Sequence, residues 1–498
     1  MSQRELKEAF VSNLNGTSLG EVALGSFLAP LCFINRGLVW ILYYMGTGAI
    51  PLPFPWISHF FLDFSMIIAP LVLSCTMLSD ILHWVIVGLA VVSVAVQCCV
   101  YHAKGSRAAM RPQTATTKSF LQSHVQSGRV PMVTVFRVLV NVKTAISILA
   151  VDFNVFPRRY AKTELYGTGV MDFGVGAYIF ANALVSPEAR GKTIIGSKMK
   201  HIAKQLMTVW PLVALGLGRL ASLKMTGYHE HVTEYGVHWN FFFTLAIVRV
   251  VASLLLALFP VSYSWIFAVL LGGLYQLALE TTGLKSFMIH NNDRTVDFLH
   301  ANKEGLFSVV GYIAIYMAGV QIGLYLMKPR TLVRDYFRVI RNFLLGSAVL
   351  YGGLFLCQAT VEPVSRRLAN LSFCLWTVAQ CTFFLACLAL GDMVLLMLQR
   401  KSHCYFVPSS WNPHEKDKDS VAERKRSSLD RFCLFQAINR NQLLFFLLAN
   451  VTTGLTNILV DTFSTSDYVS VSVLLSYMFI NCGAVHILHL CKITVKFW

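Results

Sequence analysis

The residues whose types and spacing could support chemistry are concentrated in one polar stretch between two long apolar runs. This stretch starts at Asp152, contains a proline that would stop a helix, and ends near Gly167 and Gly169, which permit tight backbone turns. Its charged residues, including one at the start of the following run, are Asp152, Arg158, Arg159, Lys162, Glu164 and Asp172. Ionisable groups at a membrane surface are costly and are often functional. The alternative is a loop of snorkelling arginines and local ion pairs, which composition alone does not exclude.

A second polar stretch runs from Tyr228 to Asn240 and is expected on the same side of the membrane. Glu234, His238 and Asn240 could donate or accept hydrogen bonds with a polar substrate, and Asn302, before a later apolar run, could add to them. His229 and His231 could in principle bind a metal ion, but no HExxH or comparable zinc pattern occurs. We therefore expect no metal site.

Cationic residues also fall within or beside the apolar runs, where an isolated charge must face a partner, a cavity or water. Those that could meet an anionic ligand are Arg137, Lys143, Lys192 and Arg249. Each could equally form a structural pair.

The composition identifies the class of protein that positions these residues. Hydrophobic residues make up 55% and charged residues 13% of the 498 positions, and the mean hydropathy is +0.58. Soluble domains carry roughly 25% charged residues, so a soluble fold could not cover this much apolar surface. The apolar runs do not alternate with polar residues as barrel strands do. The sequence predicts an all-α, polytopic transmembrane bundle in a single domain, 1–498.

About thirteen runs are long enough to span a bilayer. They lie near 22–47, 57–79, 82–103, 131–151, 169–187, 205–224, 240–260, 263–282, 306–327, 339–360, 369–398, 442–463 and 468–490. The net charge of +17 is concentrated in odd-numbered loops. The positive-inside rule then places these loops and the C-terminus in the cytosol, and the N-terminus and the even-numbered loops in the lumen or the exterior. Nucleic-acid binding is not expected, because the basic residues are divided among separate loops. The polar segment 400–440 is predicted to be a flexible cytosolic loop.

Several motifs resemble one family of membrane enzymes. The stretch Ala150–Gly176, AVDFNVFPRRYAKTELYGTGVMDFGVG, resembles the signature of the inositol acyltransferases of glycosylphosphatidylinositol (GPI)-anchor biosynthesis, the PIG-W family. Further resemblances cover 232–244, 302–306, 317–321, 364–374 and 494–498, so the similarity extends over nearly the whole chain.

The resemblance implies a multi-pass enzyme of the endoplasmic reticulum. It would transfer a fatty acyl group, typically palmitoyl, from acyl-CoA to the inositol ring of glucosaminyl-phosphatidylinositol, with no bound cofactor. The family's catalytic positions correspond to Asp152 and Lys162. An inositol hydroxyl is a weak nucleophile, so Asp152 is the hypothesised base, and Lys162 could stabilise the oxyanion.

The other candidates follow from these roles. The substrate-binding candidates are Arg158, Arg159, Glu164, Asp172, Glu234, His238, Asn240 and Asn302. Acyl-CoA, a cytosolic molecule, would meet Arg137, Lys143, Lys192 and Arg249, and its thioester would have to reach lumenal residues through the bundle.

Two other classes of function remain open from the residues. A polytopic lipid or solute transporter or flippase would also have many spans and buried charges. A non-catalytic membrane scaffold would tolerate single charge changes in the loop after Asp152.

Overall fold

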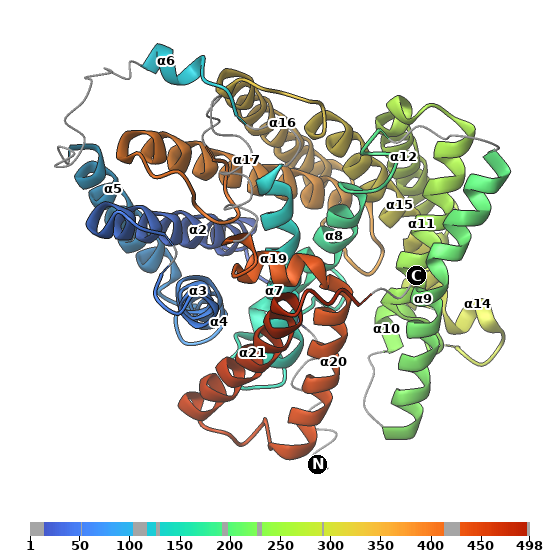
Figure 1. Cartoon of the computed structure of the whole chain (residues 1–498). Coiled ribbons are helices and arrows are strands. Elements are labelled where there is room, and N and C mark those ends of the chain that lie inside the picture. Colours follow the sequence, from blue (N-terminus) through green and yellow to red (C-terminus); the bar gives the residue numbers. More distant parts are fainter. Residues whose placement is uncertain are drawn as a thin grey trace.

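The computed structural model describes residues 14–50, 52–102, 117–125, 130–191, 198–226, 232–290, 293–412 and 429–495. Within these ranges the chain is helical, with a few isolated β-bridges and no strand. The elements, labelled as in Figure 1, are α2 (Leu19–Thr47), α3 (Pro55–Asp63), the π-helix η1 (Phe64–Ile68), α4 (Ala69–Ser74), α5 (Leu82–His102), α6 (Thr117–Leu121), α7 (Pro131–Ala150), the 3-10 helix η2 (Arg158–Tyr160), α8 (Val170–Ala183), α9 (Lys198–Thr226), α10 (Val232–Tyr235), α11 (Phe241–Leu258), the 3-10 helix η3 (Val261–Tyr263), α12 (Ser264–Thr281), α13 (Leu284–His290), α14 (Phe298–Ala301), α15 (Lys303–Leu326), α16 (Val333–Thr360), α17 (Leu371–Ser402), α19 (Leu434–Arg440), α20 (Gln442–Leu459) and α21 (Asp467–Leu490).

The helices confirm the predicted polytopic bundle. In the described part of the chain, eleven helices are long and apolar enough to cross a membrane. The other two predicted spans are also helical. However, α8 has only 14 residues, and the apolar part of α9 is limited to Gln205–Ala221. The count of thirteen spans therefore includes one helix, α8, that is shorter than an ordinary span, and one, α9, that is long but has only a short apolar part.

Polar residues at the helix ends mark where several long helices begin. Ser18 caps α2 by accepting a hydrogen bond from the Glu21 amide. The Asn240 side chain caps α11, and Asn370 caps α17 in the same way. Such caps satisfy backbone amides that have no partner within the helix.

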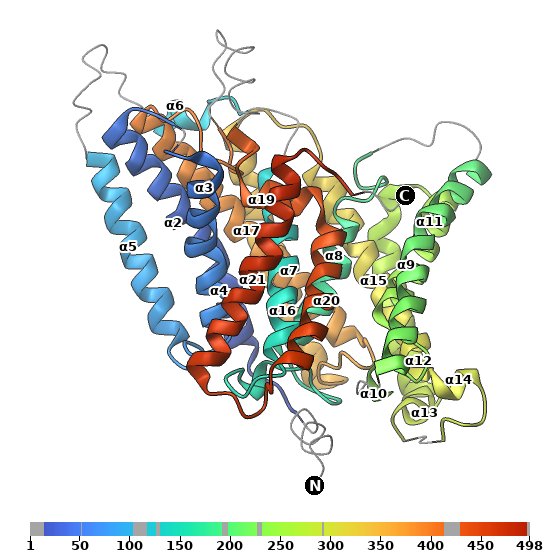
Figure 2. The ribbon, with the colours of Figure 1, turned by 60° about the horizontal axis from the view of Figure 1, so that its bottom comes forward.

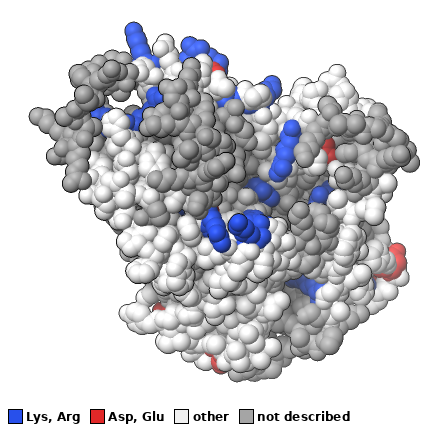
Figure 3. All heavy atoms as spheres, viewed as in Figure 1, with Lys and Arg blue, Asp and Glu red and all other residues white. Residues whose placement is uncertain are grey.

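Successive long helices alternate in direction, so that the connections gather at the two ends of the bundle (Figure 2). One end carries the loop 151–169, which we call the motif loop, together with α10, α13 and α14. We call this the motif end. The opposite end carries α6 and the start of α16. Figure 3, which has the same viewpoint as Figure 1, shows more Lys and Arg than Asp and Glu on the face that it presents.

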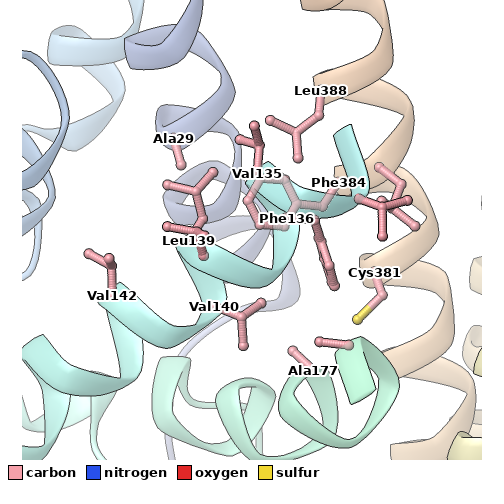
Figure 4. Close-up of a cluster of buried hydrophobic side chains, with 14 of the residues drawn as sticks. Ala29, Val135, Phe136, Leu139, Val140, Val142, Ala177, Cys381, Phe384 and Leu388 are labelled. Atoms are coloured by element: carbon pink, nitrogen blue, oxygen red, sulfur yellow. The ribbon is translucent and has the colours of Figure 1, made fainter. Parts of the chain in front are cut away.

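The core lies where α2, α7, α8 and α17 meet (Figure 4). Phe136 of α7 packs edge-on against Phe180 of α8 and Phe384 of α17, with ring centroids 6.1 and 5.3 Å apart. Small residues such as Ala29 and Ala177 let the helices approach closely around it. This packing fixes α7, the helix that leads into the motif loop.

The predicted flexible segment 400–440 is divided by the structure. Phe406, Val407 and Trp411 are buried before its middle, and Cys433 and Leu434 are buried after it. Residues 413–428 lie outside the described residues. Both flanks of the segment are therefore packed in the bundle through apolar side chains and are not flexible loops. The prediction of a flexible loop applies only to the central part.

Candidate active site

The motif loop turns sharply where α7 ends and is held against the N-terminal segment. The Asp152 amide donates to the Leu149 carbonyl, 3.1 Å away. Farther along, Gly167 has a φ of +129°, and a Cβ at this position would lie 2.1 Å from the Asn15 carbonyl oxygen. Only glycine fits this close approach.

Arg158 organises the loop itself. Its guanidinium donates hydrogen bonds to the carbonyls of Val151, Phe153 and Phe156, at 2.8 to 2.9 Å. Burial lowers the pKa of Arg158 to about 10, and the nearby Asp152 carboxylate opposes this shift. Arg158, predicted as a substrate-binding residue, is therefore used largely to hold the backbone.

Arg159 points to a different group of residues. It pairs with Glu21 of α2 at 2.9 Å and with Asp80 at 2.7 Å. Burial would lower the pKa of Arg159, but hydrogen bonds to these carboxylates raise it. These three residues, with Ser79 and His83, line a cavity of about 270 Å³.

Lys162 is the cation of the motif loop that pairs with a carboxylate of α10. Its Nζ lies 2.6 and 2.9 Å from the two carboxylate oxygens of Glu234 in α10. Burial alone would raise the pKa of Glu234, but the charges of Lys162 and Arg366 lower it to about 2. Glu234 is thus ionised at neutral pH, and Lys162, with 36% of its side chain exposed, has a fixed negative partner.

Arg366 links this pair to Asp172. Its guanidinium lies 2.7 Å from Asp172 Oδ1 and 3.3 Å from Glu234 Oε1. Asp172 is fully buried and also accepts from the Thr163 amide at 3.1 Å. Lys162, Glu234, Arg366 and Asp172 form one charge network, which we call the lysine network. It joins the motif loop, α10, α8 and the loop 361–370.

A second cluster of charged side chains surrounds Arg367, next to the lysine network. Its guanidinium lies 3.0 Å from Glu304 of α15 and 3.9 Å from Glu164 of the motif loop. Arg294 pairs with the same Glu304 at 2.7 Å. Glu164 therefore belongs to an interhelical ion cluster beside the lysine network.

Asp152 has a partner from near the other end of the sequence. Asn457 Nδ2, near the end of α20, donates to Asp152 Oδ2 at 2.7 Å. In addition, Asn154 Nδ2 of the motif loop donates to the Phe463 carbonyl. The hairpin formed by α20 and α21 therefore contacts the motif loop at Asp152.

Of three further predicted substrate-binding residues, two occupy structural positions. Asn240 caps α11 and donates to the Gly216 carbonyl at 2.9 Å. Asn302 is fully buried and accepts from the His238 amide at 2.8 Å. The side chain of His238 is exposed at the motif end, so among these three only His238 is available to a ligand at the surface.

The predicted acyl-CoA residues are dispersed along the bundle. Arg137, in the first half of α7, donates to Gln442 Oε1 at 2.7 Å and lies near Arg190. Lys143 donates to the Gly25 carbonyl of α2. Arg249 of α11 interacts electrostatically with Tyr316 of α15. Lys192, like His229 and His231, lies outside the described residues.

Arg366, Arg367 and Asn457 were not predicted from the sequence as site residues. The arginine doublet lies in the loop between the tenth and eleventh predicted spans. An alternating topology puts this loop on the same side of the membrane as the motif loop and the polar stretch 228–240, so the doublet could have been identified from the order of the spans. Asn457 has no comparable signal, because it is one of several polar residues in a largely apolar helix.

The arrangement combines a carboxylate and a paired ammonium on one loop at one end of a membrane bundle. A carboxylate can accept a proton from a hydroxyl, and an ammonium can stabilise an oxyanion. Within the described ranges, no group of three or more His, Cys, Asp or Glu residues is placed to hold a metal ion. The groups present suit acid–base chemistry on a substrate at the membrane surface.

Comparison with known proteins agrees with the resemblance in the motif loop. The GWT1 family matches residues 3–488. The chain is 44% identical to the Bos taurus protein named glucosaminyl-phosphatidylinositol-acyltransferase PIGW, and 42% identical to its Homo sapiens counterpart, each over 100% of both chains. It is 32% identical, over 99% of both chains, to a Yarrowia lipolytica protein named GPI-anchored wall transfer protein 1. The chain therefore belongs to the GWT1 family.

Proposed function

We propose that this protein is an acyltransferase of GPI-anchor biosynthesis that acylates the inositol ring of glucosaminyl-phosphatidylinositol, with acyl-CoA, typically palmitoyl-CoA, as the donor. Family membership and full-length identity to relatives named for this activity support the reaction. The observation that carries the proposal is the motif loop, which presents Asp152 and the partly exposed Lys162 at one end of the bundle.

Asp152 acts as the general base. It takes the proton of an inositol hydroxyl while the hydroxyl oxygen attacks the thioester carbon. The C–O bond forms, the C–S bond breaks, and CoA leaves as a thiolate that then takes up a proton. The acyl group passes directly to the inositol oxygen, without a covalent enzyme intermediate.

Lys162 stabilises the oxyanion of the tetrahedral intermediate. The ionised Glu234 holds the ammonium in place through two hydrogen bonds, so the cation needs little rearrangement when negative charge develops. Arg366 in turn fixes Glu234. Asp172 in turn pairs with Arg366. The neighbouring pair of Arg367 and Glu164 lies beside this network.

The CoA moiety binds toward the opposite end, where cations could meet its phosphates. Arg137 and Arg190 lie close enough to repel one another, and an anionic ligand between them would relieve this repulsion. Helix α7 continues from Arg137 to Ala150, which at 1.5 Å per residue is about 20 Å along the axis. The pantetheine arm and thioester must cover this depth to reach Asp152.

The proposal includes a cellular location and an orientation in the membrane. We place the protein in the endoplasmic reticulum membrane, with the motif end and N-terminus lumenal and the C-terminus cytosolic. The excess of Lys and Arg in the loops at the opposite end supports this orientation. Acyl-CoA then enters from the cytosolic side, and the lipid substrate is acylated near the lumenal side.

Acyl transfer can be tested in microsomes from cells that lack their own activity, supplied with labelled palmitoyl-CoA and glucosaminyl-phosphatidylinositol. Wild type is compared with Asp152→Asn and with Asp467→Asn at matched expression. Asp467→Asn is a matched control, because the same change is made at an exposed carboxylate at the start of α21. We expect labelled inositol with wild type and Asp467→Asn only.

Other outcomes would change the proposal. Full labelling with Asp152→Asn would keep the reaction but remove Asp152 as the base. No labelling with folded wild-type protein would reject the enzyme and favour the lipid transporter or flippase.

A further inference from the structure

Asn457 links the α20–α21 hairpin to Asp152, and α20 packs beside α7 (Figures 1 and 2). Its amide nitrogen donates to Asp152 Oδ2 at 2.7 Å. A carboxylate held by such a bond has fewer orientations available, and therefore keeps its geometry before substrate binds. Asn457 is thus in direct contact with the group that the proposed function requires as base.

The other polar atom of the same side chain has no partner. Asn457 Oδ1 is buried, and no hydrogen bond to it occurs in the described structure. A buried acceptor without a partner carries a free-energy cost, because it has lost its hydrogen bond to water. Leucine and isoleucine are common in this part of α20, at Leu455, Ile458 and Leu459. A leucine at position 457 would avoid this cost, so packing alone does not account for asparagine.

Anchoring of the hairpin does not account for it either. Asn154 already joins the motif loop to the segment after α20 through the Phe463 carbonyl. Thr452 and Thr453 of α20 bond to Asn481 and Tyr477 of α21. These contacts hold the hairpin without Asn457.

A hydroxyl of the substrate can supply the hydrogen-bond donor that Asn457 Oδ1 lacks. In glucosaminyl-phosphatidylinositol the phosphate and the glucosamine occupy two of the six ring oxygens of inositol, which leaves four free hydroxyls. A hydroxyl that gives its proton to Asp152 can therefore have a free hydroxyl on the adjacent ring carbon, within a few ångströms. That neighbour can donate to Asn457 Oδ1, which is on the same amide that orients Asp152.

We propose that Asn457 is a positioning and specificity-determining residue, whose amide NH₂ orients Asp152 and whose carbonyl oxygen accepts a hydrogen bond from the hydroxyl adjacent to the one acylated. Asn457 thereby selects which inositol hydroxyl faces the base. This inference rests on the proposed function.

The test uses the full-length protein with palmitoyl-CoA and glucosaminyl-phosphatidylinositol, and compares Asn457→Leu with Asn450→Leu. Asn450 lies on the same helix but donates to its own helix, at the Phe446 carbonyl, so it controls for loss of an asparagine from α20. We expect Asn457→Leu to lower kcat at least about 10-fold with the KM for palmitoyl-CoA unchanged. Asn450→Leu should remain within about twofold of wild type, a difference too small to indicate a lost positioning contact.

A second variant gives a readout that a structural role would not move. Asn457→Asp keeps the side-chain shape but sets a second carboxyl against Asp152, with Arg158 as the nearby cation. Two carboxylates sharing a site raise one apparent pKa. We expect the acidic limb of the kcat–pH profile to move upward by about 1 unit or more.

The outcomes separate this inference from the function on which it rests. If Asp152→Asn is inactive while Asn457→Leu keeps wild-type kcat and Asn457→Asp keeps the wild-type profile, the role of Asn457 is refuted and the base is retained. If Asp152→Asn is fully active, the base assignment fails first. Acylation of a second ring position by Asn457→Leu would support the selection of one hydroxyl.

Discussion

Replacing Arg366 with glutamine removes the cation between two carboxylates, one of which has no access to water. The Arg366 side chain is 4% exposed and the Asp172 side chain 0% exposed, and Arg366 Nε lies 2.7 Å from Asp172 Oδ1. Breaking a buried pair by removing one partner leaves an uncompensated charge, which costs about 3–5 kcal/mol. Glu234 keeps Lys162 as a partner, so most of the loss comes from Asp172.

The double variant Asp172→Asn/Arg366→Gln provides the internal comparison. Removing both charges also removes the unpaired carboxylate, so the double variant should be more stable than Arg366→Gln alone. We expect the two changes to differ from additivity by about 2 kcal/mol or more, since residues in one buried network couple by roughly 0.5–3 kcal/mol.

Denaturant unfolding in detergent micelles, followed for wild type, both single variants and the double variant, measures this coupling. Additive effects of the two single changes would show that Arg366 and Asp172 do not stabilise each other. The reasoning that the lysine network is held together by this buried pair would then be refuted.

Three further predictions concern the groups around the site. Glu234→Gln should lose roughly 3 kcal/mol of stability at neutral pH, from a pKa lowered to about 2. Because that pKa is depressed, the difference from wild type should persist above about pH 4.5 and diminish as the pH falls toward 2, in unfolding measured against pH. Arg137→Gln should raise the KM for palmitoyl-CoA with little change in kcat; an unchanged KM in steady-state assays would remove Arg137 from the CoA site. Arg158→Lys should lower the unfolding temperature, because an ammonium cannot reproduce a planar guanidinium bonded to three carbonyls. A raised KM for the lipid substrate with unchanged stability would instead support the predicted substrate contact.

The sequence was sufficient for the helices, because the energetic rule involved is local. A stretch of about 20 apolar residues forms a span wherever it occurs in the chain, and helices lie at all the predicted positions. The alternation of loops between the two sides of the membrane was also predictable, and it puts Lys162 of the motif loop on the same side as Glu234 of α10.

The detailed partners were not predictable, because they depend on how distant helices pack. Arg366 lies 194 positions from Asp172, and Asn457 lies 305 positions from Asp152. For Arg158 the partners are local, but they were not predicted either. Its residue type and position suggested a ligand contact, but the turns of its own loop place three carbonyls around the guanidinium.

The pairing of Asp152 with Asn457 also affects how the protein is made. At about 5–20 residues per second, the ribosome takes roughly 15–60 s to add the residues that separate the two partners. For that time the motif loop exists without its neighbour from α20, while much of the bundle can already assemble. A chain interrupted before α20 would retain most of its helices and still have an incomplete site. Catalytic competence is therefore acquired late in synthesis, after most of the protein has entered the membrane.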